Sequence, residues 1–197
     1  MIKTICVFCG SSLGAKEIYS RMAENLAEYF LKNNIKLVYG GSNVGLMHIL
    51  AETMLNGGGV VIGVMPRSLV DREVAHDHLT EMHIVGDMQE RKALMASLSD
   101  AFIALPGAFG TLDELFEVLT WNQLGIMTKP VGLLNINGYF DDLVRLLDKA
   151  RDEGFLRVEH HEILQVDTDP AGLCHKIENF CPREAEKWID RLKEGKI

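Results

Sequence analysis

The chain has 197 residues, of which 47% are hydrophobic and 24% are charged, so it can bury the core of one domain but not comfortably of two. Its formal net charge is −8 and its Lys and Arg residues form no cluster, which argues against nucleic acid and anionic membranes as partners. Its longest apolar runs have the length of strands, so no segment is expected to span a bilayer.

The first segment, MIKTICVFCGSS, is interpreted as a buried strand. Its apolar run is shorter than that of a signal peptide and no small-residue cleavage site follows, so we expect a cytoplasmic protein. Cys6 and Cys9 have C-x-x-C spacing, but an odd offset within a strand points them to opposite faces. We therefore predict two buried thiols rather than a redox pair. Cys174 and Cys181 show no metal-binding spacing.

Along the rest of the chain, apolar runs alternate with amphipathic stretches. Strands are predicted at 4–9, 36–39, 59–65, 81–85, 101–105, 130–135 and 162–167, and helices near 16–33, 44–57, 88–98, 111–124, 139–153 and 170–180. Several strands are apolar throughout, which indicates that both faces of the sheet are covered. The pattern predicts an α/β fold with a doubly wound, mostly parallel sheet and helices on both faces (Rossmann-like), in one domain over 1–197. The charged stretch 183–197 is predicted to be a C-terminal helical extension.

Ligands of such folds bind beyond the carboxyl ends of the strands, so the turns that leave the strands are informative. They read CGSSLG (9–14), YGGSNVGLM (39–47), MPRSL (65–69) and LPGAFGT (105–111). None contains Lys, a Walker loop or the G-x-G-x-x-G fingerprint, which argues against NTP hydrolysis. Glycine lets the backbone approach a ligand, and a helix start attracts an anion. We expect the turns 40–46 and 107–111 to lie side by side and to enclose one phosphate, aided by Ser42 and Thr111.

The residues Thr111 and Glu114 permit two interpretations. T-x-x-E is a capping box, in which each side chain satisfies an amide at the helix start. Alternatively, Glu114 is a catalytic carboxylate; from these residues alone the capping box is favoured. Glu117 follows one turn later and is expected to be solvated. Trp121 follows one turn after that and is expected to pack in the core.

Two further groups of polar residues have ordinary explanations. Arg91 and Lys92 lie on the helix that begins in DMQERKALM, where charges are usually solvated. His76 and His78 form an H-x-H pair, but no matched Cys or carboxylate framework accompanies them. We therefore expect a polar loop and no metal site.

Taken together, several motifs resemble one family. PGAFGTLDE resembles the PGGxGTxxE motif of the LOG (lonely-guy) family, and MQERK its MxxRK element. CVFCGSS, LVYGGSNVGLM, REVAH and the stretch TWNQLGIMTKPVGLLN are also similar to that family, over about residues 1–170. The resemblance implies hydrolysis of the N-glycosidic bond of cytokinin riboside 5′-monophosphates, or of AMP, to free base and ribose 5-phosphate. It also implies a homodimer or larger assembly with sites beside a subunit interface, and no cofactor. Members were long labelled lysine decarboxylases.

The resemblance also assigns site residues. Glu114, the final Glu of the motif, would be the catalytic carboxylate, and Arg91 of MxxRK the second catalytic residue. With the resemblance, the catalytic interpretation of Glu114 overtakes the capping box. The glycine turns and the motifs together predict substrate contacts from Glu73, Lys92, Gly40, Gly41, Gly107, Ala108, Phe109, Gly110, Thr111, Leu112, Asp113 and Thr120.

Three residues depart from the family pattern. Ala108 replaces the second Gly of PGG, and a positive φ there would be strained. Gln89 stands where His is common. His48 stands where Gly is usual, and would either crowd the helix packing or add a polar group near the site.

Two rival functions remain open at this point. A pyridoxal-phosphate decarboxylase would need a Schiff-base lysine, and Lys92 and Lys129 are the lysines near the expected site. A nucleotide-binding or carrier protein without catalysis is the other rival, although it has no need of Glu114. Finally, the stretch 115–127 is apolar around much of its circumference, which predicts a homodimer that buries it.

Overall fold

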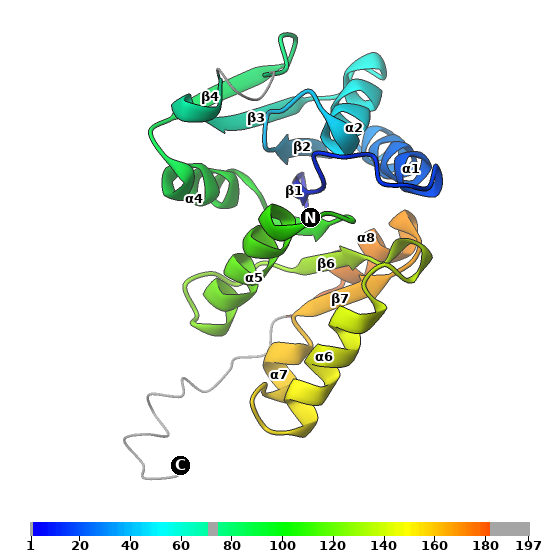
Figure 1. Ribbon diagram of the computed structural model, residues 1–197, viewed down its shortest axis with the longest axis vertical. Coiled ribbons are helices and arrows are strands. Elements are labelled where there is room, and N and C mark those ends of the chain that lie inside the picture. The colour runs from blue at the N-terminus through cyan, green and yellow to red at the C-terminus, as the bar shows by residue number, and fades with distance from the viewer. Residues whose placement is uncertain (1, 71–74, 182–197) are drawn as a thin grey trace.

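A computed structural model of the protein describes residues 2–70 and 75–181 (Figure 1). In these residues seven strands form one sheet in the order β4-β3-β2-β1-β5-β6-β7, and every neighbouring pair of strands is parallel. The strands are β1 (Thr4–Phe8), β2 (Lys36–Tyr39), β3 (Val61–Pro66), β4 (Glu81–Val85), β5 (Ala101–Ala104), β6 (Val131–Leu134) and β7 (Leu164–Asp167). The order reverses between β1 and β5, so the carboxyl ends of these two strands form the switch point at which ligands bind in such sheets.

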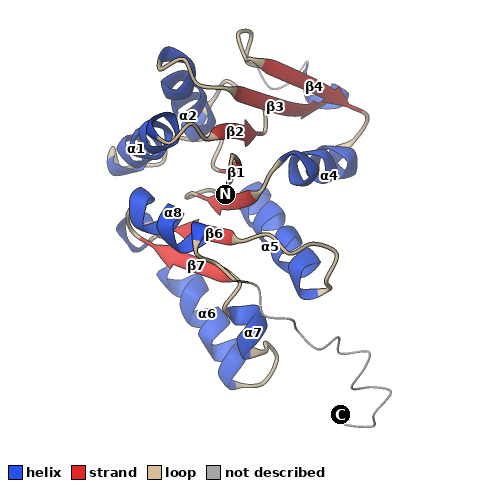
Figure 2. Ribbon diagram, turned by 180° about the vertical axis from the view of Figure 1, so that it is seen from behind, coloured by secondary structure: helices blue, strands red, loops and turns tan. Residues whose placement is uncertain are grey.

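Helices cover both faces of the sheet, as predicted. One core contains buried side chains of α1 (Ile18–Lys32), α2 (Gly45–Asn56) and α8 (Pro170–Glu178), and the other contains those of α4 (Met88–Leu98) and α5 (Phe109–Gln123). Viewed from behind, α1, α2 and α8 lie on one side of the strands and α4 and α5 on the other (Figure 2). The predicted doubly wound α/β fold is confirmed.

The two N-terminal cysteines lie on opposite faces of the sheet. Cys6 belongs to the core beneath α4 and α5, whereas Cys9 belongs to the core beneath α1 and α2. Both thiols are free and buried, and burial raises the pKa of each well above its usual value. The prediction of two buried thiols is therefore confirmed.

The elements that the sequence did not predict are short. They are α3 (Arg67–Val70), α7 (Val158–His161) and the 3₁₀ turn η1 (Ile136–Gly138). A four-residue helix is barely one turn long, so its apolar residues cannot show a helical repeat. The turn η1 also delays the helix predicted from 139, because Asn137 and Gly138 have positive φ angles of 53° and 70°; that helix is α6 (Asp141–Asp152).

Two predictions concern the ends and the surroundings of the chain. The helical extension predicted at 183–197 lies outside the described residues, and the single-domain organisation over 1–197 stays a prediction. In the part of the chain that the structure describes, every helix is too short or too polar to cross a bilayer.

Candidate active site

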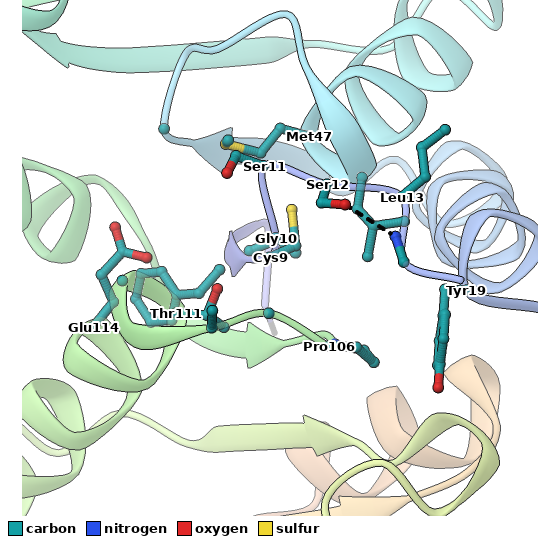
Figure 3. A pocket seen from close by; sticks show the side chains of 18 of the residues that line it. Cys9, Gly10, Ser11, Ser12, Leu13, Tyr19, Met47, Pro106, Thr111 and Glu114 are labelled. Carbon is teal, nitrogen blue, oxygen red and sulfur yellow. Dashed lines mark hydrogen bonds between the residues drawn. The ribbon is translucent and has the colours of Figure 1, made fainter. Parts of the chain in front are cut away.

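A cavity of about 330 Å³ opens at the carboxyl ends of β1 and β5, at the switch point of the sheet (Figure 3). This volume is at the lower end of the range for small-molecule sites. The walls come from three turns rather than from the two that we expected. Because β1 stands between β2 and β5, the turn 9–14 lies between the turns 40–46 and 107–111, and all three contribute lining residues.

Backbone hydrogen bonds tie the three turns together. The Gly10 amide donates to the Pro106 carbonyl at 3.0 Å, and the Leu46 amide donates to the Gly10 carbonyl at 3.1 Å. The second bond occupies an amide in the first turn of α2. Neither helix has a side-chain cap, since the N-cap residues are Val44 and Ala108, but no such bond from the described residues occupies the first amides of α5, at residues 109–111. The α5 start is therefore the better anion site of the two.

The backbone of this region leaves room for two functional side chains. A Cβ atom at Gly107 would collide with the Thr111 hydroxyl, and one at Gly40 would collide with the Arg91 guanidinium. Glycine is required at both positions for this close approach. Ala108 has a φ of −104°, so the strain that a positive φ would bring does not arise, and Ala replaces Gly there without a backbone penalty.

The capping-box interpretation of Thr111 and Glu114 is wrong. Helix α5 begins at Phe109, two residues earlier than predicted, with Ala108 as its N-cap. Thr111 is therefore inside the first turn, and Glu114 follows in the next one. Both side chains are buried and both line the cavity, where Figure 3 shows them side by side.

Arg91 and Glu114 meet at the wall of the cavity. The Arg91 Nε donates to the Val64 carbonyl at 3.0 Å and Nη2 to the Gly40 carbonyl at 3.4 Å, which fixes the guanidinium. Its Nη1 lies 3.6 Å from Glu114 Oε1, an ion pair that is longer than a hydrogen bond. The two catalytic candidates from MxxRK and PGGxGTxxE are thus brought together.

The environment of Glu114 shifts its acidity toward neutral pH. Glu114 is only 8% exposed, and its burial raises the pKa of its carboxyl group to about 7. The positive charge of Arg91 opposes this shift, and the negative charge of Asp113 adds to it. A carboxyl group with a pKa near 7 exchanges its proton readily at physiological pH, which suits acid–base work. Perturbed carboxyls of this kind gather at active sites.

Lys92, the next residue along α4, points elsewhere. Its Nζ forms ion pairs with Asp113 Oδ2 at 3.2 Å and with Glu117 Oε1 at 3.0 Å. Burial lowers the pKa of Lys92, but the hydrogen bonds that its ammonium group donates to the two carboxylates, together with their charges, outweigh burial and raise the pKa overall. Lys92 therefore ties α4 to α5 beside the cavity rather than lining its wall.

The predicted substrate contacts separate into two groups. The cavity is lined by Gly40, Gly107, Ala108, Gly110 and Thr111. A second, shallow groove on the outer side of α5 is lined by Phe109, Leu112, Asp113 and Thr120, together with Phe116, Glu117 and Trp121. Gly41 packs against Met82 of β4, and Glu73 lies outside the described residues.

The sequence analysis missed several cavity residues. Ser11, Ser12 and Leu13 come from the turn after β1, and Tyr19 from the start of α1. The first three could have been predicted, because they belong to the turn CGSSLG, and this turn follows β1, one of the two strands at the switch point. Tyr139 also lines the cavity, and its hydroxyl donates to the Gly107 carbonyl at 2.8 Å. It comes from the loop after β6, where no local pattern marks it.

The lysines that a Schiff-base cofactor would need are already engaged. Lys129 Nζ donates to the carbonyls of Ala96 and Ser99 at 2.8 and 2.7 Å, and Lys92 is held by its two carboxylates. Within residues 2–70 and 75–181, three potential metal ligands gather only outside the cavity, at His48, Glu52 and His76.

Comparisons with known proteins identify the family of the chain. A family model described as "Possible lysine decarboxylase" matches residues 47–177. The chain is 49% identical over 181 residues to the cytokinin riboside 5′-monophosphate phosphoribohydrolase LOG1 of Arabidopsis thaliana, covering 92% of this chain and 85% of that protein. It is 47% identical over 180 residues to LOG3 of the same plant, which has the same enzyme name, covering 91% of this chain and 84% of that protein.

Solved structures share the fold. The molybdenum cofactor carrier protein of Chlamydomonas reinhardtii superposes with a TM-score of 0.67 at 21% identity, over 90% of this chain and 97% of that one. The structural genomics target TM1055 gives 0.68 at 22% identity, over 90% and 99%. At such identities the likeness concerns the fold alone. The family match and the identity to the curated plant proteins show more: the chain belongs to the LOG family, whose curated relatives are named cytokinin riboside 5′-monophosphate phosphoribohydrolases.

Proposed function

We propose that the protein hydrolyses the N-glycosidic bond of a nucleoside 5′-monophosphate, a cytokinin riboside monophosphate or AMP, to free base and ribose 5-phosphate. The observation that carries the proposal is the buried Glu114 carboxyl beside an uncapped helix start in one cavity. The helix start suits the phosphate, and the carboxyl suits the reacting sugar carbon. The plant relatives bear the name of this activity.

The phosphate would bind at the start of α5. The first-turn amides of a helix and its dipole attract an anion, and Thr111, buried in the cavity, adds a hydroxyl donor. Charge-assisted hydrogen bonds contribute about 1.5–3 kcal/mol each. Contacts to a phosphate far from the bond that breaks can position the sugar for the reaction.

Glu114 would act on the sugar. Breaking the bond between C1′ and the base nitrogen leaves positive charge on the ribosyl group, as in other glycoside hydrolyses. An ionised carboxylate stabilises that charge and takes a proton from the water that attacks C1′. Arg91 stays protonated and cannot be the base. Its three fixed contacts support a role in holding Glu114 and in keeping part of it ionised.

We infer that the active form is a homodimer. The outer side of α5 and the loop after it expose Phe109 (90%), Ile126 (66%) and Leu124 (54%). The groove lies outside the cavity of its own subunit, so we infer that its residues contact a substrate bound in the cavity of a second subunit. These residues are Phe109, Leu112, Asp113 and Thr120. We therefore propose that this groove completes the site of the partner.

An interface variant tests the dimer separately from the chemistry. Ile126→Asp should give a monomer by light scattering and lose turnover, although its own Glu114 and Arg91 remain in place. Leu146→Asp is the matched control, because Leu146 of α6 is also exposed (60%) but does not line the groove on α5. A monomeric wild type of 22.0 kDa, or a fully active Ile126→Asp monomer, would contradict the proposal.

We also assign the protein to the cytoplasm. Cys6, Cys9 and Cys174 are buried free thiols and Cys181 is an exposed one, which is the usual state in a reducing compartment. Alkylation of cell extracts under non-reducing conditions, followed by mass spectrometry of the four cysteines, measures this directly; a Cys181 disulfide in most of the protein would argue for another compartment.

One assay tests the reaction. The protein is incubated with AMP, isopentenyladenine riboside 5′-monophosphate, adenosine and ATP at equal concentration, and free base is measured by chromatography. Monophosphates should be cleaved, and adenosine should be poorer by about two to four orders of magnitude in kcat/KM, the value of two lost charge-assisted bonds. ATP should also be a poor substrate, because a closed turn leaves no room for a longer phosphate chain. Ribose 5-phosphate should inhibit competitively. Equal rates on AMP and adenosine would refute the phosphate site, and binding of AMP without release of base would establish a carrier.

A further inference from the structure

A cluster of polar side chains lies at α2, among residues that do not line the cavity. His48 and Glu52 are four residues apart on α2, so they share one face of the helix. His76 comes from the loop before β4 and meets them. The ligand atoms of the three residues all lie within 4.8 Å of one another, and His76 Nε2 is 3.0 Å from Glu52 Oε1. The cluster joins α2 to a loop that is 24 residues away in the sequence.

The position of His76 is fixed by the backbone on both sides of it. Its amide donates to the Gly41 carbonyl at 3.1 Å, and the preceding Ala75 forms an antiparallel bridge with Ser42. The side chain of His76 is only 2% exposed. A buried imidazole in a fixed position gives a preformed ligand, which lowers the cost of ordering a site on binding.

His48 has the tautomer that a metal ligand needs. Its Nδ1 lies 2.6 Å from the Asn43 side-chain oxygen, which can only accept, so the ring hydrogen is on Nδ1 and the lone pair is on Nε2. In metal sites a ligating His commonly donates its second ring nitrogen to a carbonyl or carboxylate in this way. Asn43 thus occupies the place of an orienting residue.

An ordinary ion pair does not explain the whole cluster. A pair of His76 and Glu52 would account for those two residues, but it requires neither His48 nor its bond to Asn43. Two buried hydroxyls nearby, of Tyr39 and of Ser42, also have no hydrogen-bond partner among the described residues. Tyr39 lies within electrostatic reach of Glu52, since burial, Cys9 and then Glu52 all raise its pKa.

We propose that His48, Glu52 and His76 form a binding site for a divalent transition metal of the zinc class. Two imidazole nitrogens and one carboxylate oxygen, with a fourth position for water, are a donor set that Zn²⁺ prefers over Mg²⁺ or Ca²⁺. Donors on a tetrahedral zinc lie about 3.4 Å apart, so the widest pair, at most 4.8 Å apart, must approach by up to about 1.4 Å.

One proton moves when the metal binds. His76 Nδ1 accepts the His78 amide at 3.3 Å, so the ring hydrogen is on Nε2, facing Glu52. Coordination through Nε2 moves that hydrogen to Nδ1, and the long bond from the His78 amide is given up. The metal would clamp α2 to the loop before β4. His78 itself is not a ligand, so the site differs from the H-x-H pair considered from sequence. Its new member is His48, which departs from the Gly of the LOG pattern.

Metal titration of the full-length chain tests the site. The protein is stripped with a chelator, and Zn²⁺ binding is measured by calorimetry, with Co²⁺ absorption as a report of tetrahedral coordination. Wild type should bind one equivalent and melt at a higher temperature in Zn²⁺. His48→Gln and Glu52→Gln should each weaken binding by about 100-fold and abolish the thermal shift, and Asn43→Ala should weaken it by about 10-fold.

Two matched controls exclude adventitious binding. His78→Gln removes the exposed histidine of the H-x-H pair, and Cys181→Ser removes the exposed thiol; both should bind Zn²⁺ as wild type does. Absence of a one-to-one complex would overturn the site, and so would binding that survives His48→Gln but is lost in Cys181→Ser. Circular dichroism of each variant without metal shows whether it is folded, and Asn43→Ala decides the case if a ligand variant is not. Because binding is read directly, the result is independent of any nucleotide activity.

Discussion

Two consecutive residues of α4 form ion pairs with the same helix, α5, and they do so in opposite ways. Lys92 holds Asp113 and Glu117 at 3.2 and 3.0 Å, with both carboxylates at least partly exposed to solvent. Arg91 approaches Glu114 only to 3.6 Å, in a site where both side chains are about 10% exposed. In the first contact, one ammonium group is shared by two carboxylates at hydrogen-bond distance. In the second, burial outweighs the partner, and the pKa of Glu114 rises to about 7.

The comparison distinguishes an ion pair that stabilises the fold from one that leaves a carboxyl group with a raised pKa. A close ion pair favours the ionised form and lowers the pKa of a carboxyl. In a buried and loosely paired carboxyl group the ionised form is unfavourable. The ionised form becomes more favourable when positive charge develops beside it. The difference between the two contacts therefore supports the proposal that Glu114, and not Asp113 or Glu117, is the reactive group.

Replacing Glu114 should have the largest effect. Glu114→Gln keeps the volume of the side chain but removes the charge, so kcat/KM for AMP should fall by about 10³-fold. Circular dichroism and ribose 5-phosphate binding should remain close to wild type. Glu117→Gln is the control, one turn further along α5, and should lose less than about tenfold. A folded Glu114→Gln protein with near-normal turnover would end the catalytic assignment.

The raised pKa of Glu114 also predicts a pH-dependent stability. The folded-state pKa of about 7 exceeds the ordinary value of 4.5, so between these pH values the folded protein binds more protons than the unfolded chain. The free energy of unfolding should therefore decrease as pH rises from 4.5 to 7, by about 3 kcal/mol for this one group. Urea unfolding at pH 5 and pH 8 measures the change. Glu114→Gln should lack this part of it, and equal pH dependence in both proteins would contradict the shift.

Arg91→Lys sharpens the comparison, because it keeps the charge but removes the planar donors. The variant cannot hold the Val64 and Gly40 carbonyls and Glu114 at once, so kcat/KM should fall by about 10–100-fold through misplacement of the carboxyl. If the ionised carboxylate is the active form, the rise of kcat/KM with pH should also move to higher pH. An unchanged pH profile would show that Arg91 does not act through Glu114.

Lys92→Met should have the smallest effect on catalysis. It leaves Asp113 and Glu117 without their partner, so the free energy of unfolding should fall by about 1 kcal/mol, while kcat/KM changes by less than about tenfold. Thermal melting and AMP kinetics on the same sample check both values. A loss of two orders of magnitude in kcat/KM with unchanged stability would instead support the substrate contact that the family resemblance assigns to Lys92.

The sequence predicted the strands well, most clearly the inner strands β1, β2, β3, β5 and β6, which are largely buried on both faces. Runs such as AFIAL and KLVY have few polar residues, and their ends are marked by Gly, Pro or Asp, so the seven strands were placed within one or two residues. Arg91 and Glu114 came from the motifs, and the fold brings them together. The start of α5 was misplaced, because Phe109 carries no helix signal of its own and Thr111 looks like a cap.

What the sequence could not predict depends on residues that are distant along the chain. Tyr139 reaches the cavity only because β6 lies beside β5, and the turn 9–14 separates the other two turns only because β1 lies between β2 and β5. His48, Glu52 and His76 likewise meet only after α2 and the loop before β4 pack together. Side chains assembled in this way leave no periodic or spaced pattern to recognise.

The pairing of β1 with β5 has a consequence for the folding of the chain during its synthesis on the ribosome. Ile5 aligns with Ala101, and the three strands that follow β1 in the chain, β2, β3 and β4, all lie on the other side of β1. At about 5–20 residues per second, the strand that covers this edge of β1 is synthesised many seconds after β1 itself. Until then, a nascent half-sheet presents an open edge, the kind of surface that recruits chaperones or aggregates. Glu114 follows β5, so the proposed catalytic carboxyl reaches its site in the same step that closes this edge.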